Sequence, residues 1–156
     1  MPHIHKNIDF TVEVFIVFAN TVLLRKHDKY GIWLSVGGHI ELNEDPNQAA
    51  IREVKEEVGL NIRLVDDLLP FERATPEYKE LIPPKFLNRH RINDIHEHVT
   101  LTYFATTDNH AIQVGLDEKS SELKWFTKEE IESNTEILDR IKVYALRALA
   151  EVRSSK

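Results

Sequence analysis

A chain of 156 residues is long enough to bury a sizeable hydrophobic core, and we expect residues 1–156 to form a single domain. Twenty Lys and Arg residues against 26 Asp and Glu residues give a formal net charge of −6. That balance argues against a protein held to nucleic acid by bulk basic charge. The absence of cysteine excludes disulfide bonds, thiol catalysis and thiolate metal sites.

The N-terminal part of the sequence shows no targeting signal. Residues 1–10 contain no apolar stretch of the kind that a signal sequence needs. The most apolar run covers residues 14–19, far short of the roughly 20 residues that span a bilayer. We therefore expect a soluble, cytoplasmic protein with no membrane partner.

The first third of the chain predicts a hairpin and a further strand. Residues 10–19 are dominated by β-branched and aromatic side chains, which favour a strand. Asn20 offers a turn, and residues 22–26 predict the returning strand. A short apolar run at residues 32–36 stops at the pair Gly37-Gly38, after which a polar loop begins.

A helix is predicted from Pro46, with Asp45 as its N-cap and Gly59 as its C-terminal cap. Apolar residues recur along it at steps of three and four, which predicts a face packed on the core. That face consists of Ala50, Ile51, Val54 and Val58.

The middle of the chain mixes a strand with a long irregular stretch. Residues 61–69 predict a strand, whereas residues 70–95 contain four prolines and predict an irregular loop. Loops of this length in compact domains are usually functional. Residues 96–107 alternate apolar with polar side chains, which predicts a strand with one buried face.

The last part of the chain predicts one more strand and two helical segments. The strand covers residues 122–126, a capping box of Thr127 and Glu130 begins a helical turn over residues 127–132, and residues 135–152 form an amphipathic helix. Strands and helices do not alternate strictly. We therefore expect an α/β (α+β) sandwich, a mixed β-sheet flanked by helices, and not a doubly wound parallel sheet.

Three carboxylates are predicted to share one face of the helix that begins at Pro46. Glu53 lies three residues before Glu56 and four before Glu57. Like charges at this spacing destabilise a helix by about 0.2–0.5 kcal/mol per pair, and Arg52 offsets only part of that. A hard divalent cation such as Mg²⁺ removes the repulsion and prefers oxygen ligands. The alternative is an ordinary solvated acidic face.

The spacing around these carboxylates is more specific than the carboxylates alone. A glycine is followed by Glu after five residues, by an Arg-Glu pair after seven more, and then by an aliphatic residue, a Glu-Glu pair, a glycine and an aliphatic residue. These positions are Gly38, Glu44, Arg52, Glu53, Val54, Glu56, Glu57, Gly59 and Leu60. The pattern of residues 38–60 resembles the signature of the Nudix hydrolases at every fixed position. The strands before it and the Trp125-Phe126 strand extend the similarity loosely to about residue 130.

The resemblance implies a Nudix fold over a single Nudix hydrolase domain, residues 1–156. It also implies a metal-dependent hydrolase that uses Mg²⁺ or Mn²⁺ and cleaves a diphosphate (pyrophosphate) linkage in a nucleoside diphosphate derivative. Glu56 and Glu57 would be the main metal ligands, and Glu53 either a third ligand or the general base. A backbone carbonyl of Gly37 or Gly38 would complete the protein's share of the coordination.

The resemblance further implies a positioning role for Arg52. Its guanidinium would pair with Glu44 or with a ligand carboxylate and fix the orientation of that carboxylate. The expected catalytic residues are therefore Glu44, Arg52, Glu53 and Glu57, and the expected metal ligands are Gly38, Glu53, Glu56 and Glu57.

Residues 85–91 are the predicted substrate-binding segment, because they carry three cations and a histidine within an acidic protein. Arg89 and Arg91 are expected to contact phosphate oxygens, with Lys85 beside them. Phe86 is expected to stack on a base. A solvated basic loop paired with the acidic surface is the alternative. Further stacking candidates are Trp33, Phe71 and Tyr78.

Two other groups of residues are candidates for metal or ligand binding. His96 and His98 are expected to face the same side of their strand, where they can bind a metal ion or contact a ligand. Many Nudix enzymes also draw an acidic ligand from outside the signature. The candidates for it are Asp94, Glu97, Asp117, Glu118 and Glu122.

The sequence does not select the substrate. Pro76 stands where ADP-ribose-type Nudix enzymes often have proline, and Tyr78 stands where dinucleoside polyphosphate types often have tyrosine, so the two cues conflict. The small size favours a (deoxy)nucleoside triphosphate pyrophosphatase as the default. The alternatives are an ADP-ribose or dinucleoside polyphosphate hydrolase and, in another class, a non-catalytic nucleotide-binding Nudix sensor domain. The expected partners are a small-molecule nucleotide and a possible homodimer, with no nucleic acid polymer.

Overall fold

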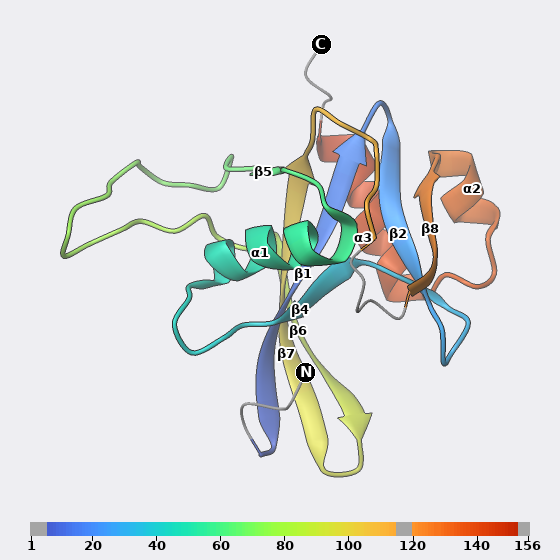
Figure 1. The fold of residues 1–156 in the computed structure, drawn as a ribbon, viewed down its shortest axis with the longest axis horizontal. Helices are drawn as coiled ribbons and strands as arrows, with labels where there is room; N and C mark the ends of the chain where they lie inside the picture. The colour runs from blue at the N-terminus through green and yellow to red at the C-terminus, as the bar shows by residue number, and fades with distance from the viewer. Residues whose placement is uncertain (1–5, 115–119, 153–156) are drawn as a thin grey trace.

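The computed structural model describes residues 6–114 and 120–152. A mixed β-sheet lies between α1 (Pro46–Val58) on one face and α3 (Asp139–Glu151) on the other, with α2 (Lys128–Ser133) beside α3 (Figure 1). This architecture confirms the predicted α+β sandwich. In the described part of the chain, no helix is long and apolar enough to cross a membrane.

The described strands form one eight-stranded sheet built around two long strands that run parallel. In chain order the strands are β1 (Ile8–Phe18), β2 (Thr21–His27), β3 (Trp33–Leu34), β4 (Val36–His39), β5 (Arg63–Leu64), β6 (Phe86–Asn93), β7 (His96–Thr106) and β8 (Ser120–Phe126). β1 pairs with β7 in parallel, and the other strand pairs of the described residues are antiparallel. β1 pairs with β2 at its end and with β4 along its first half, so β4 brings the residues before α1 to the middle of the sheet.

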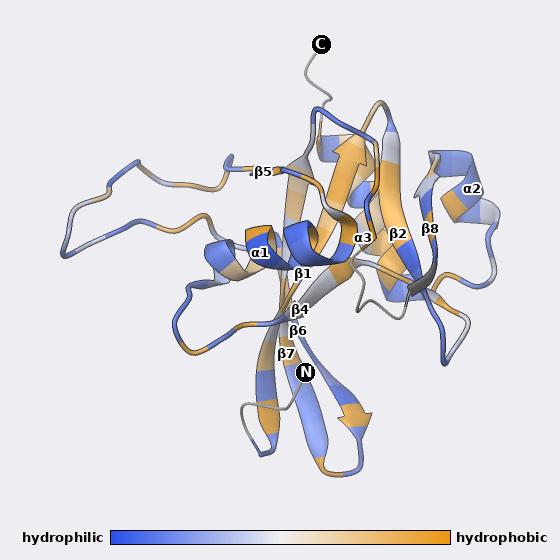
Figure 2. Ribbon diagram, viewed as in Figure 1, coloured by the Kyte–Doolittle hydropathy of each residue, from blue (hydrophilic) through white to orange (hydrophobic). Residues whose placement is uncertain are grey.

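β1 is buried on both faces, which explains its nearly continuous apolar sequence. Phe15 and Val17 belong to the core under α3, whereas Val14 and Ile16 belong to the core under α1. Figure 2 shows hydrophobic residues along the upper parts of β1 and β2, while the lower part of β7 and most of β6 are hydrophilic. The sheet therefore has an apolar half that holds the fold together and a polar half that is available for chemistry.

α1 begins and ends where its caps were predicted. The Asp45 carboxylate accepts a hydrogen bond from the Gln48 N–H (2.9 Å), and the Gln48 side chain accepts one from the Asp45 N–H (2.9 Å). Gly59 ends the helix in the left-handed region, with φ at 71°. The prediction that Ile51 faces the core is wrong, because Ile51 is 46% exposed. The buried face of α1 instead includes Glu53 and Glu57, which lie on the side of Val54 away from Ile51.

The other differences from the predicted elements concern residues 61–95 and the C-terminal helix. The predicted strand at residues 61–69 shrinks to β5, and the following segment extends away from the sheet (Figure 1). Residues 86–93, predicted as loop, form β6 against β7. The alternation of exposed and partly buried residues along β6 is hard to see in the sequence, because its exposed face carries charged side chains, as is common in edge strands. α2 confirms the helical turn after Thr127, but α3 begins only at Asp139.

Candidate active site

α1 carries two buried carboxylates one turn apart. Glu53 and Glu57 are 5% and 7% exposed, whereas the Glu56 side chain between them is 56% exposed. The i,i+4 spacing places Glu53 and Glu57 on the same side of the helix, next to the apolar residues that fix α1 on the sheet. Burying two carboxylates is costly unless they are paired or bind a cation, so their partners define the site.

Arg52 is the first of these partners. Its Nε and Nη2 atoms donate hydrogen bonds to the two carboxylate oxygens of Glu44, at 2.9 and 2.6 Å. Its Nη1 atom lies 3.0 Å from an oxygen of Glu53 and 3.0 Å from an oxygen of Glu56, and Nη2 also donates to the His39 carbonyl (2.9 Å). The Arg52 hydrogen bonds hold the pKa of Glu44 below its usual value, and Glu44 in turn raises the pKa of Arg52.

The two glycines of β4 allow the carboxylates to approach the strand. The Gly37 N–H donates a hydrogen bond to Glu57 Oε2 (3.1 Å). A β-carbon at Gly38 would lie 2.5 Å from an oxygen of Glu53, so no side chain fits there without moving that carboxylate. Arg25 approaches the other side, with its Nε atom 3.6 Å from Glu57 Oε2.

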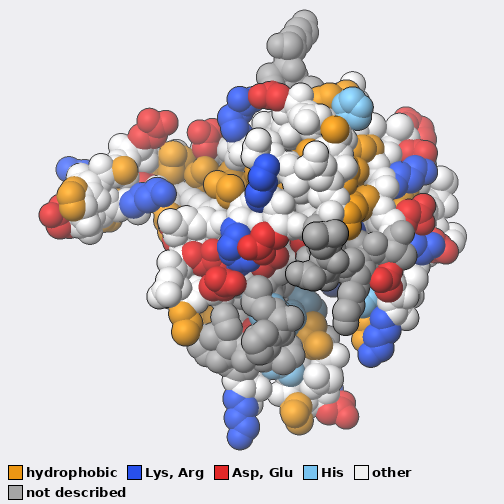
Figure 3. All heavy atoms as spheres, viewed as in Figure 1, with side chains coloured by type: hydrophobic (Ala, Val, Ile, Leu, Met, Phe, Trp, Pro, Cys, Tyr) orange, Lys and Arg blue, Asp and Glu red, His pale blue; other side chains and the backbone are white. Residues whose placement is uncertain are grey.

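These residues open into one groove, which we call the carboxylate groove. It has a volume of about 910 Å³ and is lined by Gly37, Gly38, Glu53, Glu56 and Glu57, together with residues of β1, β2, β6, β7 and the start of α3. Figure 3 shows acidic side chains gathered on the visible face over α1. The groove is large enough for a nucleotide, since small-molecule pockets usually measure about 300–1,000 Å³.

Comparisons with known proteins identify the family of this chain. The family model of the NUDIX domain matches residues 10–146. The crystal structure of a hydrolase of the NUDIX family from Clostridium perfringens is 36% identical in sequence, with a TM-score of 0.79, and the match covers 91% of this chain and 96% of that one. The chain belongs to the Nudix hydrolase family.

Two further matches are weaker, one in sequence identity and the other in coverage. A MutT NUDIX hydrolase structure from Burkholderia pseudomallei matches with a TM-score of 0.67 over 95% of this chain and all of that one, and its 18% identity supports the fold alone. Among curated proteins, an octanoyltransferase from Myxococcus xanthus is 37% identical over 70 residues. That match covers 44% of this chain and only 19% of the curated protein, so the chain spans a small part of that relative.

The residues of the carboxylate groove fit a divalent metal ion. Nudix hydrolases act on small-molecule nucleotides and generally depend on such an ion. Glu53, Glu56 and Glu57 offer only oxygen donors, which hard cations such as Mg²⁺ and Mn²⁺ prefer. Arg52 reaches two of these carboxylates with a single Nη atom, and a divalent cation would balance the charge that remains.

The structure separates the four residues predicted to bind substrate. Arg91 lines the carboxylate groove. Lys85 forms ion pairs with Asp67 and Glu151 at the far end of β6, and Phe86 stacks on the Tyr144 ring of α3, with 4.6 Å between ring centroids. Arg89 is exposed and pairs with Glu97. Only Arg91 of the four therefore lies among the groove residues.

The other stacking candidates do not line the carboxylate groove. Trp33 is 4% exposed and packs edge-to-face on Phe126, with 4.8 Å between ring centroids, whereas Phe71 and Tyr78 are about half exposed on the extended segment before β6. The described candidates for an acidic ligand outside the signature are likewise absent from the groove lining; they are Asp94, Glu97 and Glu122. Asp117 and Glu118 lie outside the described residues.

Sequence reasoning missed several residues of the groove. Glu13 is 6% exposed and accepts hydrogen bonds from the hydroxyls of Ser35 (2.8 Å) and Thr102 (2.6 Å). The sequence does contain a signal for Glu13, because a carboxylate between Val12 and Val14 is unusual within an apolar strand. Arg25 and Arg140 also line the groove, but they come from β2 and α3, so no local spacing relates them to the signature.

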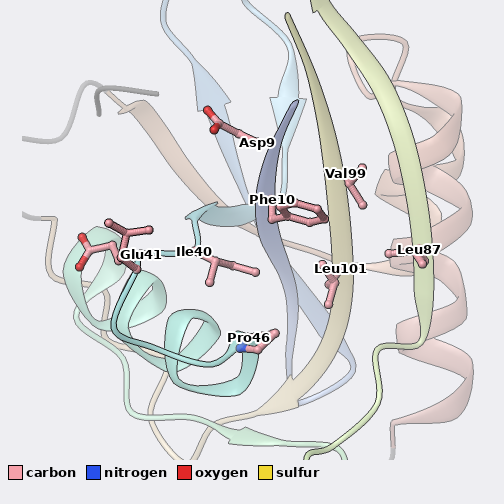
Figure 4. Close-up of a pocket in the computed structure, with 9 residues that line it drawn as sticks. Asp9, Phe10, Ile40, Glu41, Pro46, Leu87, Val99 and Leu101 are labelled. Atoms are coloured by element: carbon pink, nitrogen blue, oxygen red, sulfur yellow. The ribbon is translucent and has the colours of Figure 1, made fainter. Parts of the chain in front are cut away.

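A second cavity lies on the α1 face of the sheet. It measures about 530 Å³ and is mostly apolar (Figure 4). Its lining residues are Asp9, Phe10, Ile40, Glu41, Leu42, Pro46, Leu87, Val99 and Leu101. None of the residues predicted to be catalytic or to bind metal lines it, so this cavity is distinct from the carboxylate groove.

Proposed function

We propose that this protein hydrolyses a diphosphate linkage in a nucleoside diphosphate derivative, with Mg²⁺ or Mn²⁺ held in the carboxylate groove. Glu56 and Glu57 are the main ligands in this proposal. Glu53 is a third ligand or the group that accepts a proton from the attacking water, and the Gly38 carbonyl completes the protein's share. The proposal rests on membership of the Nudix hydrolase family and on one observation. Two carboxylates on α1 are buried beside Arg52 in a groove of nucleotide size.

The arrangement suits attack of water on phosphorus. A bound divalent cation neutralises charge on the diphosphate and acidifies water at neutral pH. The water oxygen forms a bond to phosphorus, the bond from that phosphorus to the bridging oxygen breaks, and a carboxylate within hydrogen-bond reach accepts the proton. Arg52 holds Glu53 and Glu56 in place through one Nη atom. Arg91 supplies positive charge to the substrate's phosphates at the groove wall.

The proposed substrate class is the one that the small size of the chain favours. We propose a (deoxy)nucleoside triphosphate, with ADP-ribose and dinucleoside polyphosphates as the alternatives within the same chemistry. Pro76 and Tyr78, which favour those alternatives, both belong to the extended segment before β6, where Tyr78 is 48% exposed. A nucleotide-binding sensor domain without turnover is the alternative from another class.

The test is a hydrolysis screen over a nucleotide panel in Mg²⁺ and in Mn²⁺, with the products identified to show which bond is cut. The parent protein should turn over at least one nucleoside diphosphate derivative, and Glu57→Gln should lower that rate by about two orders of magnitude or more. Glu132→Gln, which changes an exposed glutamate of α2, is the matched control. A Glu57→Gln protein as active as the parent would overturn the proposed site. Nucleotide binding with no turnover would favour the sensor.

The possible homodimer stays a prediction. Light scattering of the purified chain measures its mass directly and should give twice the chain mass of 18.2 kDa if the prediction is right.

A further inference from the structure

Histidines gather at the polar end of the sheet, on the face that α3 covers. We call Asp9, His39, His96 and His98 the histidine cluster. Asp9 lies opposite His98 in the parallel pairing of β1 with β7, and His39 lies opposite Thr11 in the pairing of β4 with β1. Asp9 and His96 are 1% and 4% exposed. Three strands thus bring four metal-ligand side chains together, two of them almost fully buried.

The distances within the cluster fit a metal ion. Asp9 Oδ2 lies 3.2 Å from His39 Nε2 and 3.2 Å from His96 Nε2. One ligand atom from each of Asp9, His39 and His98 lies within 4.8 Å of the other two. Tetrahedral Zn²⁺ with bonds of about 2.0–2.1 Å keeps its ligand atoms roughly 3.3 Å apart. The 3.2 Å contact between Asp9 and His39 matches this spacing, and the ligand atom of His98 lies within 4.8 Å of both.

The burial of Asp9 favours a cation at this cluster. A carboxylate that is only 1% exposed is costly to bury unless it is paired or binds a metal ion. The Asp9 carboxylate supplies the negative charge that a divalent ion needs.

We propose that Asp9, His39 and His98 form a binding site for a transition metal ion of the Zn²⁺ type, separate from the carboxylate site on α1. His96, which contacts the Asp9 oxygen that also faces His39, orients the carboxylate. Two imidazoles and one carboxylate are a donor set that suits Zn²⁺. This set differs from the all-oxygen set of Glu53, Glu56 and Glu57, which suits Mg²⁺.

The histidine cluster borders the carboxylate groove, because His39 and His98 both line it. His39 directly follows Gly38, and its carbonyl accepts a hydrogen bond from Arg52 (2.9 Å). The two sites are therefore neighbours along β4, although their donor sets differ. An ion in the histidine cluster would present a positive charge to an anionic ligand, such as a phosphate oxygen, in the same groove.

Metal binding by the purified full-length protein tests this proposal. Co²⁺ is the spectroscopic probe, Zn²⁺ the competitor, and excess Mg²⁺ is present to fill the carboxylate site. We expect one equivalent of Co²⁺ with the visible absorption of a nitrogen-ligated ion, displaced by Zn²⁺. His98→Gln and His39→Gln should abolish the signal, and His96→Gln should weaken binding by about 10- to 100-fold, as expected for a residue that orients a ligand.

Three controls make the result decisive. His110→Gln changes an exposed histidine stacked on Phe18, at the opposite end of β1 from Asp9, and should bind Co²⁺ like the parent. The double variant His3→Gln/His5→Gln tests the histidines near the N-terminus and should also bind normally. Glu57→Gln should keep Co²⁺ binding while losing Mg²⁺-dependent hydrolysis, which separates this proposal from the proposed function.

Stability provides the second measurement in case a histidine variant unfolds. Zn²⁺ should raise the Tm of the parent, since a ligand that binds only the folded state stabilises it. The near-isosteric Asp9→Asn variant should lose most of this rise. Absence of Co²⁺ uptake in the parent, or uptake and a Zn²⁺-induced Tm rise that persist in His39→Gln, His98→Gln and Asp9→Asn, would overturn the proposal.

Discussion

The α-carbon of Gly38 faces the carboxylate of Glu53 so closely that a β-carbon there would lie 2.5 Å from Glu53 Oε1. The atoms in the way belong to the end of a flexible side chain and not to the backbone. Gly38→Ala should therefore fold with a Tm near that of the parent but displace Glu53 and lower kcat by about tenfold or more, because small misplacements at a site are costly. Thermal unfolding and hydrolysis assays on one preparation check both halves of this prediction.

The neighbouring glycine offers a contrasting variant. A β-carbon at Gly37 would lie 2.1 Å from the Val12 carbonyl oxygen and 2.8 Å from Glu13 Cα, which are backbone atoms of β1. Gly37→Ala should therefore destabilise the fold by about 1–3 kcal/mol or prevent it from forming. Urea unfolding measures the difference. Equal stability of the two alanine variants would show that β4 is not held against β1 as described.

Replacement of Arg52 by lysine should lower activity although the charge is kept. Arg52 donates to both oxygens of Glu44 and also reaches Glu53, a geometry that one ammonium group cannot reproduce. We expect Arg52→Lys to lose about 10- to 100-fold in kcat or in metal affinity. Arg147→Lys is the matched control, since Arg147 is an exposed residue of α3 that pairs with Glu151. Parent activity in Arg52→Lys would show that the forked contact is dispensable.

The same ion pair gives stability a defined pH dependence. The hydrogen bonds from Arg52 hold the pKa of Glu44 in the folded state below its ordinary value of 4.5. The stabilisation is therefore fully present above about pH 4.5 and is lost as the pH falls through the lower, folded-state pKa. Urea unfolding of the parent and of Glu44→Gln between pH 7 and pH 3 should show that the stability difference shrinks only below about pH 4.5. A constant difference would contradict the prediction.

The signature helix was predictable because its determinants are local. The spacing of Glu53, Glu56 and Glu57 and the caps at Asp45 and Gly59 each depend on fewer than 15 consecutive residues, and the structure has the helix with both caps where expected. The helix face was harder to predict. Ile51 fits the apolar period, but the buried stripe follows the carboxylates, which a hydrophobicity pattern counts as solvent-facing.

Contacts between distant strands could not be predicted in this way. The sequence pairs His96 with His98 through the two-residue period of a strand, but Asp9 joins them only because β1 and β7 run parallel. The four prolines of residues 70–95 predict a loop, but residues 86–93 form an edge strand in which charged residues alternate with others. Phe86 was expected at the substrate and packs on Tyr144, since the register of β6 with β7 turns it toward α3.

The role of Glu53 is open to a direct experiment. Its Oε1 atom lies 3.0 Å from Arg52 Nη1, which also donates to Glu56, so one guanidinium holds Glu53 beside a proposed metal ligand. We therefore expect Glu53→Gln to weaken Mn²⁺ binding, measured by titration, together with the fall in kcat. Saturating Mn²⁺ should then restore part of the rate. If Mn²⁺ affinity stays at the parent value while kcat falls and the acidic limb of the pH–rate profile disappears, Glu53 acts as the general base instead.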